Sequence, residues 1–345
     1  MVNQTKTINT LNKIPITILT GYLVSVKTTL LNQILNNSTG KKIAVIVNEF
    51  GEVNVDSQLI EHTTEEMIEL SNGCICCTLR GDLIEAVDKI LNENDVDAIV
   101  IESTGIGEPI PIAQAFYVHP ELLALEPNLP KIQSRVFVDA IITVIDSAQF
   151  FEMYERESLI PDDDFGRGYS QLLVEQVEGA NILVLNKTDV TTEMELKKLT
   201  DLLKLMNPFA KMIETSFGKV PIDELIDIGV FDIEAAEDSS LWVAELDKQD
   251  PDTSESEEYG MNTYVYKTTH RFNEKKLISM LEKGFPSNII RSKGIVTING
   301  TDTAFLWNQA GKFIKFEPIG RFNSSEYTYN EIVFIGTNLV SNKID

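Results

Sequence analysis

Five short runs of largely apolar, β-branched residues constrain the fold of this chain more than any other feature. The runs are Pro15–Thr20, Lys42–Val47, Ala98–Ile101, Ile141–Ile145 and Ile182–Leu185. Strands of this kind are buried on both faces, as in a parallel sheet that crossover helices cover. Segments with apolar residues at helical spacing lie between the runs, such as the segment ending near Leu35. We therefore expect an α/β domain with a mainly parallel sheet flanked by helices.

The composition changes in the last third of the chain. Residues 232–260 are acidic and poor in apolar side chains, which indicates a mobile linker. Five strand candidates and one helix candidate follow, which predicts a small α+β domain; they are Thr263–Thr268, Ile295–Ile298, Ala304–Trp307, Phe313–Phe316, Glu331–Ile335 and the helix Glu274–Lys283. The expected organisation is a flexible tail at 1–14, the α/β domain at 15–231, the linker at 232–260 and the C-terminal domain at 261–345. Within the α/β domain, Tyr154–Tyr169 reads as a surface insertion.

Charge and hydropathy narrow the classes of partner. The 53 acidic and 29 basic residues give a net charge of −24, so we expect repulsion from nucleic acid and from anionic membranes. The first fourteen residues lack the apolar stretch of a signal peptide, and no apolar run approaches the length of a membrane span. These features, with clustered and unpaired cysteines, predict a cytoplasmic protein.

All three cysteines lie within four consecutive positions, as Cys74, Cys76 and Cys77. Disulfide frameworks use an even number of cysteines spread along the chain, whereas clustered thiolates are strong ligands for zinc or copper(I). A turn signal precedes the cluster and a helical pattern follows it. The cysteines are therefore expected on a loop that enters a helix, whose N-terminus would lower the thiol pKa. Three small, buried apolar residues are the alternative.

A second chemical signal follows the first predicted strand. The segment consists of Gly21, Tyr22, Leu23, Val24, Ser25, Val26, Lys27, Thr28 and Thr29. A strand, this loop and a helix form the setting of the phosphate-binding motif G-x-x-x-x-G-K-[ST], in which the lysine neutralises phosphates and the threonine binds Mg²⁺. Gly21, Lys27 and Thr28 fit the motif, but Val26 stands where glycine is expected. By itself, this segment is explained equally well as a plain strand-to-helix turn.

Two further strand ends carry matching signals. Asn186, Lys187 and Asp189 form an N-K-x-D element after the last predicted strand of the α/β domain, and a carboxylate there can accept both N1–H and N2–H of guanine. Glu102 ends another strand and could hold Mg²⁺, while the nearby Gly105 could approach a γ-phosphate. The alternative for each segment is an ordinary turn at the end of a strand.

Taken together, these segments resemble the CobW-type family of metal-handling P-loop GTPases. The resemblance covers nearly the whole chain and rests on ITILTGYL, KTTLLNQIL, VIVNEFGEVNVD, IELSNGCICCTLRGDL, ESTGIGEP, VEQVEGANILVLNKTDV and NEIVFIG. It implies a GTPase domain, a small CobW-type C-terminal domain, GTP or GDP with Mg²⁺ at the loop and at N-K-x-D, and catalytic roles for Lys27, Thr28 and Glu102. It also implies Zn²⁺ on the three cysteines. Glu49 is a candidate fourth ligand and Glu52 matches a switch-like region; plain surface charge is the alternative for both.

The resemblance implies a GTP-dependent metallochaperone that binds zinc, or a similar divalent metal, and delivers it to a client metalloprotein. Two alternatives stay open. The family loop has glycines where this chain has Val24 and Val26, so a metal-binding relative with impaired GTP binding is the first. A structural zinc protein, or an assembly factor for a metal or cobalamin enzyme, is the second. The client and the oligomeric state stay open, a homodimer being one option.

Overall fold

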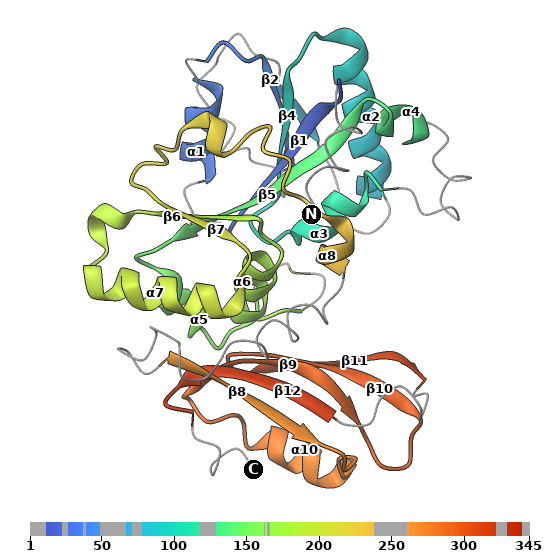
Figure 1. The fold of residues 1–345 in the computed structure, drawn as a ribbon, viewed down its shortest axis with the longest axis vertical. Helices are drawn as coiled ribbons and strands as arrows, with labels where there is room; N and C mark the ends of the chain where they lie inside the picture. The colour runs from blue at the N-terminus through green and yellow to red at the C-terminus, as the bar shows by residue number, and fades with distance from the viewer. Residues whose placement is uncertain are drawn as a thin grey trace, which may run out of the picture. The chain divides into compact units, whose positions relative to one another are not determined.

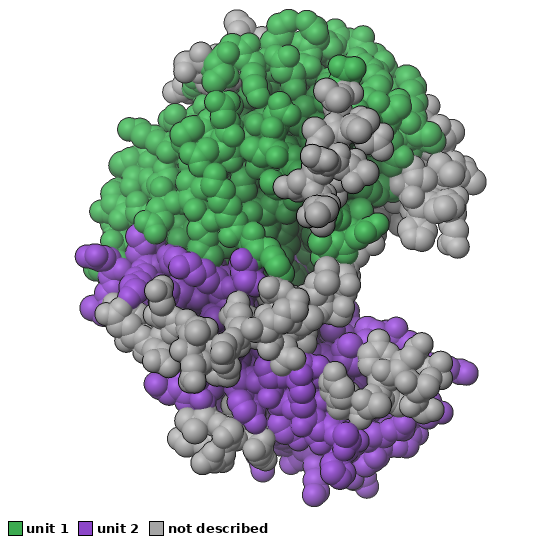
Figure 2. All heavy atoms as spheres, in the orientation of Figure 1, with its two compact units in different colours: residues 1–148, 175–192, 209–236 green, residues 149–174, 193–208, 237–345 purple. Residues whose placement is uncertain are grey.

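The structure is a computed structural model that describes residues 12–22, 27–36, 39–48, 67–70, 78–117, 129–161, 163, 166–237, 261–321 and 330–339. The chain divides into two compact units, each built from separate stretches (Figure 2). The first comprises residues 1–148, 175–192 and 209–236, and the second comprises residues 149–174, 193–208 and 237–345. The domain boundaries expected from the sequence remain a prediction.

The first unit is built on a seven-stranded sheet with the order β3-β2-β4-β1-β5-β6-β7, and every neighbouring pair is parallel (Figure 1). The strands are β1 (Ile14–Thr20), β2 (Ile43–Asn48), β3 (Met67–Leu70), β4 (Ala98–Glu102), β5 (Val136–Asp146), β6 (Ile182–Asn186) and β7 (Lys211–Glu214). The five predicted runs are β1, β2, β4, β5 and β6, which confirms the predicted fold class. The sequence pattern missed β3 and β7, which are short edge strands containing charged residues.

Helices connect these strands. They are α1 (Lys27–Leu35), α2 (Thr78–Glu93), α3 (Pro109–Gln114), α4 (Leu129–Gln133), α6 (Tyr169–Glu178) and α8 (Ile233–Glu237), with short 3₁₀ turns η2 (Thr188–Val190) and η3 (Ile222–Glu224). Helix α8 lies in the segment expected to be a linker, and residues 238–260 of that segment lie outside the described residues. Among the described residues, no helix combines the length and apolarity needed to cross a membrane.

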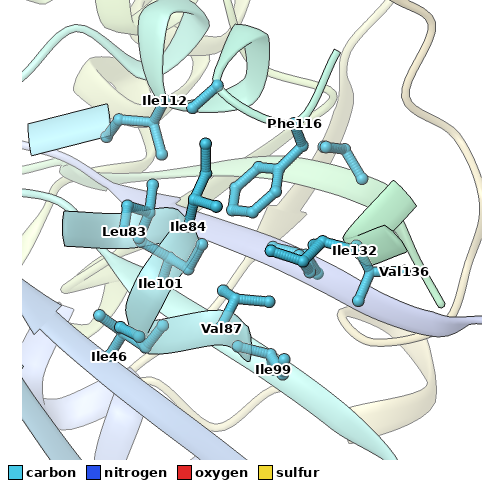
Figure 3. Close-up of a cluster of buried hydrophobic side chains, with 14 of the residues drawn as sticks. Ile46, Leu83, Ile84, Val87, Ile99, Ile101, Ile112, Phe116, Ile132 and Val136 are labelled. Carbon is cyan, nitrogen blue, oxygen red and sulfur yellow. The ribbon is translucent and has the colours of Figure 1, made fainter. Parts of the chain in front are cut away.

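Alternate side chains of the strands build two apolar layers, because successive residues of a strand point to opposite faces. On one face, Ile46, Ile99 and Ile101 pack with residues of α2 such as Leu83 and Val87 (Figure 3). On the other face, the intervening strand residues pack with α1 and η3; the cluster includes Val45, Val100, Leu30, Ile34 and Ile222. The sheet is thus covered on both faces, as its uninterrupted apolar strands require.

The second unit contains a five-stranded antiparallel sheet with the order β11-β10-β9-β12-β8. Its elements are α5 (Phe150–Tyr154), α7 (Glu193–Met206), β8 (Met261–Thr268), α10 (Glu274–Glu282), β9 (Ile289–Thr297), β10 (Thr303–Ala310), β11 (Phe313–Arg321) and β12 (Asn330–Thr337). Trp307 is almost fully buried in its core, and the side chain of Asn273 caps α10 by accepting a hydrogen bond from Lys276 N. The predicted α+β character is confirmed.

The segment Tyr154–Tyr169 is more than the surface insertion expected from its composition. Arg167 and Asp163 form a buried ion pair with an N–O distance of 2.7 Å. The hydroxyl of Tyr154 donates a hydrogen bond to Ile290 O (2.7 Å) and accepts one from Gly311 N (3.1 Å). Residues 155–159 are exposed, as expected, but the two ends of the segment are buried. The sequence missed the role of Tyr154 because its partners Ile290 and Gly311 lie more than 130 positions away.

Candidate functional site

The glycine loop begins where β1 ends. Gly21 is buried and has φ of +143°, a backbone conformation that favours glycine. The Lys27 ammonium, which is also buried, donates a hydrogen bond to Gly21 O at 2.9 Å. The two ends of the predicted loop are therefore held together by the motif lysine. Leu23, Val24, Ser25 and Val26 lie outside the described residues, while Tyr22 is half-buried.

Helix α1 starts at Lys27, so Thr28 and Thr29 lie in its first turn and are half-buried. The first turn of a helix presents backbone N–H groups that no residue of the helix can satisfy, and such groups bind phosphate. The strand and the helix required for the phosphate-binding motif are therefore present, on either side of residues 23–26.

Glu102 lies at the end of β4, the strand next to β1. It pairs with Leu19 across the two strands, and Ser103 N donates a hydrogen bond to Leu19 O at 2.9 Å. The Glu102 side chain is 5% exposed. A buried carboxylate therefore lies on the strand adjacent to the glycine loop, and the loop that contains Gly105 follows it.

The N-K-x-D residues form a tight turn at the end of β6. Asn186 is fully buried, and its Oδ1 accepts hydrogen bonds from Lys187 N (2.9 Å) and Gly218 N (3.2 Å). Lys187 adopts φ of +62°, and its Nζ lies 2.6 Å from Asp146 Oδ2 at the end of β5. Asp189 is exposed, so its carboxylate is accessible to a ligand.

A loop that the sequence pattern missed supports this turn. It consists of residues 215–218, which follow β7. The hydroxyl of Ser216 accepts a hydrogen bond from Asp189 N (3.1 Å) and lies 2.9 Å from the hydroxyl of Thr188. A Cβ added to Gly218 would lie 3.0 Å from Leu30 N, so this loop lies against α1 as well. The loop thus joins the N-K-x-D turn to the helix that starts at Lys27.

Only a weak signal marks residues 215–218 in the sequence. Gly218 is the fourth residue after β7, a strand that itself has no apolar run. Asp146 and Gln176 were missed for a related reason, because their importance comes from contacts with residues distant in the sequence.

Buried polar atoms without a hydrogen-bond partner gather at one edge of the sheet. Within the described part of the chain, such atoms occur at the carboxyl ends of four adjacent strands, β4, β1, β5 and β6; they are Thr104 Oγ1, Thr20 Oγ1, Ser147 Oγ and Asn186 Nδ2. Buried polar groups are normally satisfied, and ligands of open α/β sheets bind outside the carboxyl ends of the strands. This edge therefore has the chemistry of a polar ligand site.

The predicted metal ligands lie elsewhere in the chain. Cys74, Cys76, Cys77, Glu49 and Glu52 lie outside the described residues. Helix α2 begins at Thr78, directly after Cys77, as expected for a loop that enters a helix. No group of three or more His, Cys, Asp or Glu side chains suited to a metal ion occurs among the residues that the structure describes. The metal site remains a prediction.

Comparison with known proteins agrees with the fold. The family model described as "CobW/HypB/UreG, nucleotide-binding domain" matches residues 15–214, and the model of the "Cobalamin synthesis protein cobW C-terminal domain" matches residues 261–345. The fold and the first family model define an α/β protein with a nucleotide-binding domain of the CobW/HypB/UreG type. The chain belongs to the CobW/HypB/UreG family, which confirms the predicted resemblance.

Individual relatives extend this similarity. The chain is 36% identical over 321 residues to zinc-regulated GTPase metalloprotein activator 1 of Dictyostelium discoideum, covering 87% of this chain but 66% of that protein, slightly less than two thirds. It is 31% identical to zinc chaperone YjiA of Escherichia coli, with 97% of both chains covered. The crystal structure of Zn(II)-bound YjiA GTPase from E. coli matches 96% of this chain and 97% of that chain at 24% identity, with a TM-score of 0.43, which is too low to support a structural argument.

Proposed function

We propose that this protein is a GTP hydrolase that binds zinc, or a similar divalent metal, and delivers it to a client metalloprotein. The names of the Dictyostelium and E. coli relatives, which describe a zinc-regulated GTPase metalloprotein activator and a zinc chaperone, support this class of function. One observation carries the nucleotide part. Gly218 N donates to Asn186 Oδ1 while its Cα packs beside Leu30, so the N-K-x-D turn and helix α1 lie together at the edge with unsatisfied polar atoms.

Each residue at this edge has a role in the proposal. The Lys27 ammonium would exchange Gly21 O for the β- and γ-phosphates, while the backbone N–H groups of the loop and of α1 hold the remaining oxygens. Mg²⁺ bound with the nucleotide would neutralise phosphate charge, and Thr28 and Glu102 are the oxygen-bearing side chains that would hold it. Hydrolysis of GTP then depends on positioning and charge stabilisation, without a protein nucleophile.

Zinc is the cargo in this proposal. The thiolates of Cys74, Cys76 and Cys77 would bind it and leave a fourth tetrahedral position for Glu49, a water molecule or a ligand of the client. A site with an exchangeable position suits transfer better than a closed one. GTP would contact residues 48–56 and 102–108, and hydrolysis would remove these contacts, which couples delivery to nucleotide state.

The charge and the cysteines of the chain bear on its partners and on its compartment. A net charge of −24 disfavours nucleic acid and anionic membrane as partners, so the expected partner is a protein whose own ligands accept the metal. Assignment to the cytoplasm rests on the clustered, unpaired cysteines. Native mass spectrometry of the zinc-loaded protein would show whether a homodimer forms.

Nucleotide choice tests the role of Asp189. Guanine presents two N–H donors to one carboxylate, so the chain should prefer GTP over ATP, and Asp189→Asn should reduce that preference by about 1–3 kcal/mol. Isothermal titration with GDP and ADP measures both affinities. Equal affinity for the two nucleotides in the unsubstituted chain would contradict the assignment.

Zinc affinity tests the cysteine loop. We expect about one Zn²⁺ per chain, bound more tightly at higher pH because thiols must lose protons to bind. The double substitution Cys76→Ser and Cys77→Ser should abolish the tight site in competition titrations with a chelating dye. Unchanged affinity in this variant would rule the cysteine loop out.

Val24 and Val26 favour an alternative function, a metal-binding protein with impaired GTP binding. A β-branched residue at positive φ carries strain of roughly 1–3 kcal/mol, so replacing both valines by glycine should strengthen GTP binding by about tenfold or more. Zinc affinity measured without nucleotide should not change. If the valine chain already binds GTP at micromolar concentration or below and the glycines add nothing, the alternative loses its basis.

A further inference from the structure

Gln176 is a buried polar residue of α6 to which the proposed mechanism gives no role. Its side chain is 1% exposed, and its Nε2 donates hydrogen bonds to Gly105 O (3.1 Å) and Gly107 O (3.3 Å). Among the described residues, its Oε1 has no hydrogen-bond partner. One side-chain amide therefore holds two carbonyls of the loop that follows Glu102 and keeps an unused acceptor beside them.

The loop that Gln176 contacts has little freedom to adopt another shape. Gly107 N donates a hydrogen bond to Thr104 O at 2.9 Å, which closes a turn. A Cβ added to Gly107 would lie 3.0 Å from Thr104 Oγ1. The turn is thus compact and buried, and the side-chain amide of Gln176 connects it to a helix.

The backbone of Gln176 is itself fixed. The hydroxyl of Thr143 in β5 donates a hydrogen bond to Gln176 O at 2.7 Å. A Cβ added to Gly179, just beyond the end of α6, would lie 3.1 Å from Pro109 Cγ at the start of α3. This part of α6 is therefore anchored to the sheet and packs closely against the segment that follows the loop.

We propose that Gln176 is a positioning residue that holds the Gly105–Gly107 loop in the arrangement that recognises the γ-phosphate. This inference rests on the proposed GTPase function and adds a residue that distinguishes GTP from GDP. The two nucleotides differ only in the γ-phosphate, so a residue that positions its loop affects GTP binding and leaves GDP binding nearly unchanged. The unused Oε1 fits this role, because buried acceptors are normally satisfied and this one is left to accept a hydrogen bond when nucleotide is bound.

The test uses Gln176→Met, which keeps the length of the side chain and removes the amide. In the full-length protein with Mg²⁺, the dissociation constants of GDP and of a non-hydrolysable GTP analogue are measured by isothermal titration. We expect analogue binding to weaken about tenfold, the loss of roughly one hydrogen bond, and GDP binding to change less than twofold. Gln171→Met is the matched control on the same helix, since the Oε1 of Gln171 accepts a hydrogen bond from Gly168 N (3.0 Å), which lies outside the Gly105–Gly107 loop.

Hydrogen–deuterium exchange of the nucleotide-free proteins gives a second readout. Amides of residues 104–108 should exchange faster in Gln176→Met than in the unsubstituted chain, and Gln171→Met should leave them unchanged. Unchanged exchange, or an equal loss of GDP and analogue binding, would overturn the positioning role. Failure of both the unsubstituted chain and the Val24→Gly, Val26→Gly variant to bind GTP would refute the proposed function instead, and the exchange result would still decide whether Gln176 positions the loop.

Discussion

Phe217 combines an exposed ring with a backbone conformation that is unusual for a large side chain. Its φ is +59° and the residue is 63% exposed. A left-handed conformation costs an L-residue about 1–2 kcal/mol, and an exposed ring offsets little of this cost by burial. Strain of this kind is often found at functional sites, and Phe217 follows Ser216, which accepts from Asp189 N.

Replacing Phe217 by glycine should therefore stabilise the protein. Relief of the left-handed strain exceeds the extra entropy of glycine in the unfolded chain, which is about 0.5–1 kcal/mol, so the thermal midpoint should rise by about 1–3 °C. Differential scanning calorimetry without nucleotide measures the shift. Phe209→Gly is the control, because Phe209 is similarly exposed (65%) but does not have positive φ, and it should lower the midpoint. A lower midpoint in both variants would show that Phe217 is not strained.

Asp139 is a buried carboxylate whose pKa is raised by burial and lowered by hydrogen bonds. Its Oδ2 accepts hydrogen bonds from Asp227 N (2.8 Å) and the Thr17 hydroxyl (3.1 Å), and its Oδ1 accepts from Gly229 N. Burial nevertheless raises the pKa of Asp139 above its usual value, with these hydrogen bonds offsetting part of the rise. The residue joins β5 to the segment that precedes α8.

This pKa shift predicts how Asp139 affects stability as the pH changes. Between the unfolded pKa, about 3.9, and the higher folded pKa, the folded state binds more protons, so its stability falls as pH rises. The stability advantage of the native chain over Asp139→Asn should therefore be largest in acid and decrease toward neutral pH. Urea unfolding of both proteins at several pH values measures the contribution of Asp139 to the free energy of unfolding. An advantage that grows with pH would mean that the hydrogen bonds outweigh burial.

At the scale of elements, helices α5 and α6 form hydrogen bonds with the turn between β10 and β11. The Ser170 hydroxyl at the start of α6 donates to Ala310 O (2.8 Å), and the Tyr154 hydroxyl in α5 accepts from Gly311 N. A Cβ added to Gly168 would lie 2.1 Å from the ring of Phe313, so the approach there is close enough to require glycine. These contacts explain why residues 149–174 belong to the same compact unit as the antiparallel sheet.

Removing either hydroxyl should destabilise this unit. Ser170→Ala removes the hydrogen bond to Ala310 O, and Tyr154→Phe removes the bonds to Ile290 O and from Gly311 N, two groups that still bond to each other at 3.0 Å. Each substitution should therefore cost about 0.5–1.5 kcal/mol, the net value of a hydrogen bond. The double variant should cost less than the sum, because both hydroxyls hold neighbouring residues of one turn. Chemical denaturation followed by tryptophan fluorescence reports on this unit through Trp307. Ser134→Ala is the control, since it removes an exposed hydrogen bond to Lys131 O, and a cost equal to that of Ser170→Ala would contradict the argument.

For the whole molecule, the compact units and the family matches divide the chain differently. The match to the C-terminal family model covers residues 261–345, but the second compact unit also contains residues 149–174 and 193–208. Helix α7 packs against β8, and α5 and the start of α6 hold the turn described above. The antiparallel sheet therefore depends on chain segments that lie within the nucleotide-binding family match.

Residues 261–345 expressed alone should be less stable than the same residues in the full chain. Without α5, α6 and α7, the sheet loses the partners of Ala310, Gly311 and Phe313 and exposes apolar surface. Hydrogen–deuterium exchange should show faster exchange in β10 and β11 of the fragment than in the full-length protein. Equal protection in the two proteins would show that the sheet folds independently of these helices.

The sequence alone determines the elements of this protein and the order of its motifs. Strands such as Ile182–Asn186 are recognisable because a central parallel strand buries both faces and is therefore apolar throughout, and Gly21, Lys27 and Asp189 are recognisable because their spacing is local. Only the tertiary structure decides which residues hold the site residues in place. Gln176 and Gly105, Gly218 and Leu30, and Lys187 and Asp146 are in contact although they lie 41 to 188 positions apart in the sequence. No local pattern encodes which distant groups meet.

 Lys187 and Asp146 are the nearest of these three pairs in the sequence, and Leu30 and Gly218 are the most distant. Such pairs form only when the sheet and its helices have packed, because packing brings the ends of strands that are distant in the sequence to one edge.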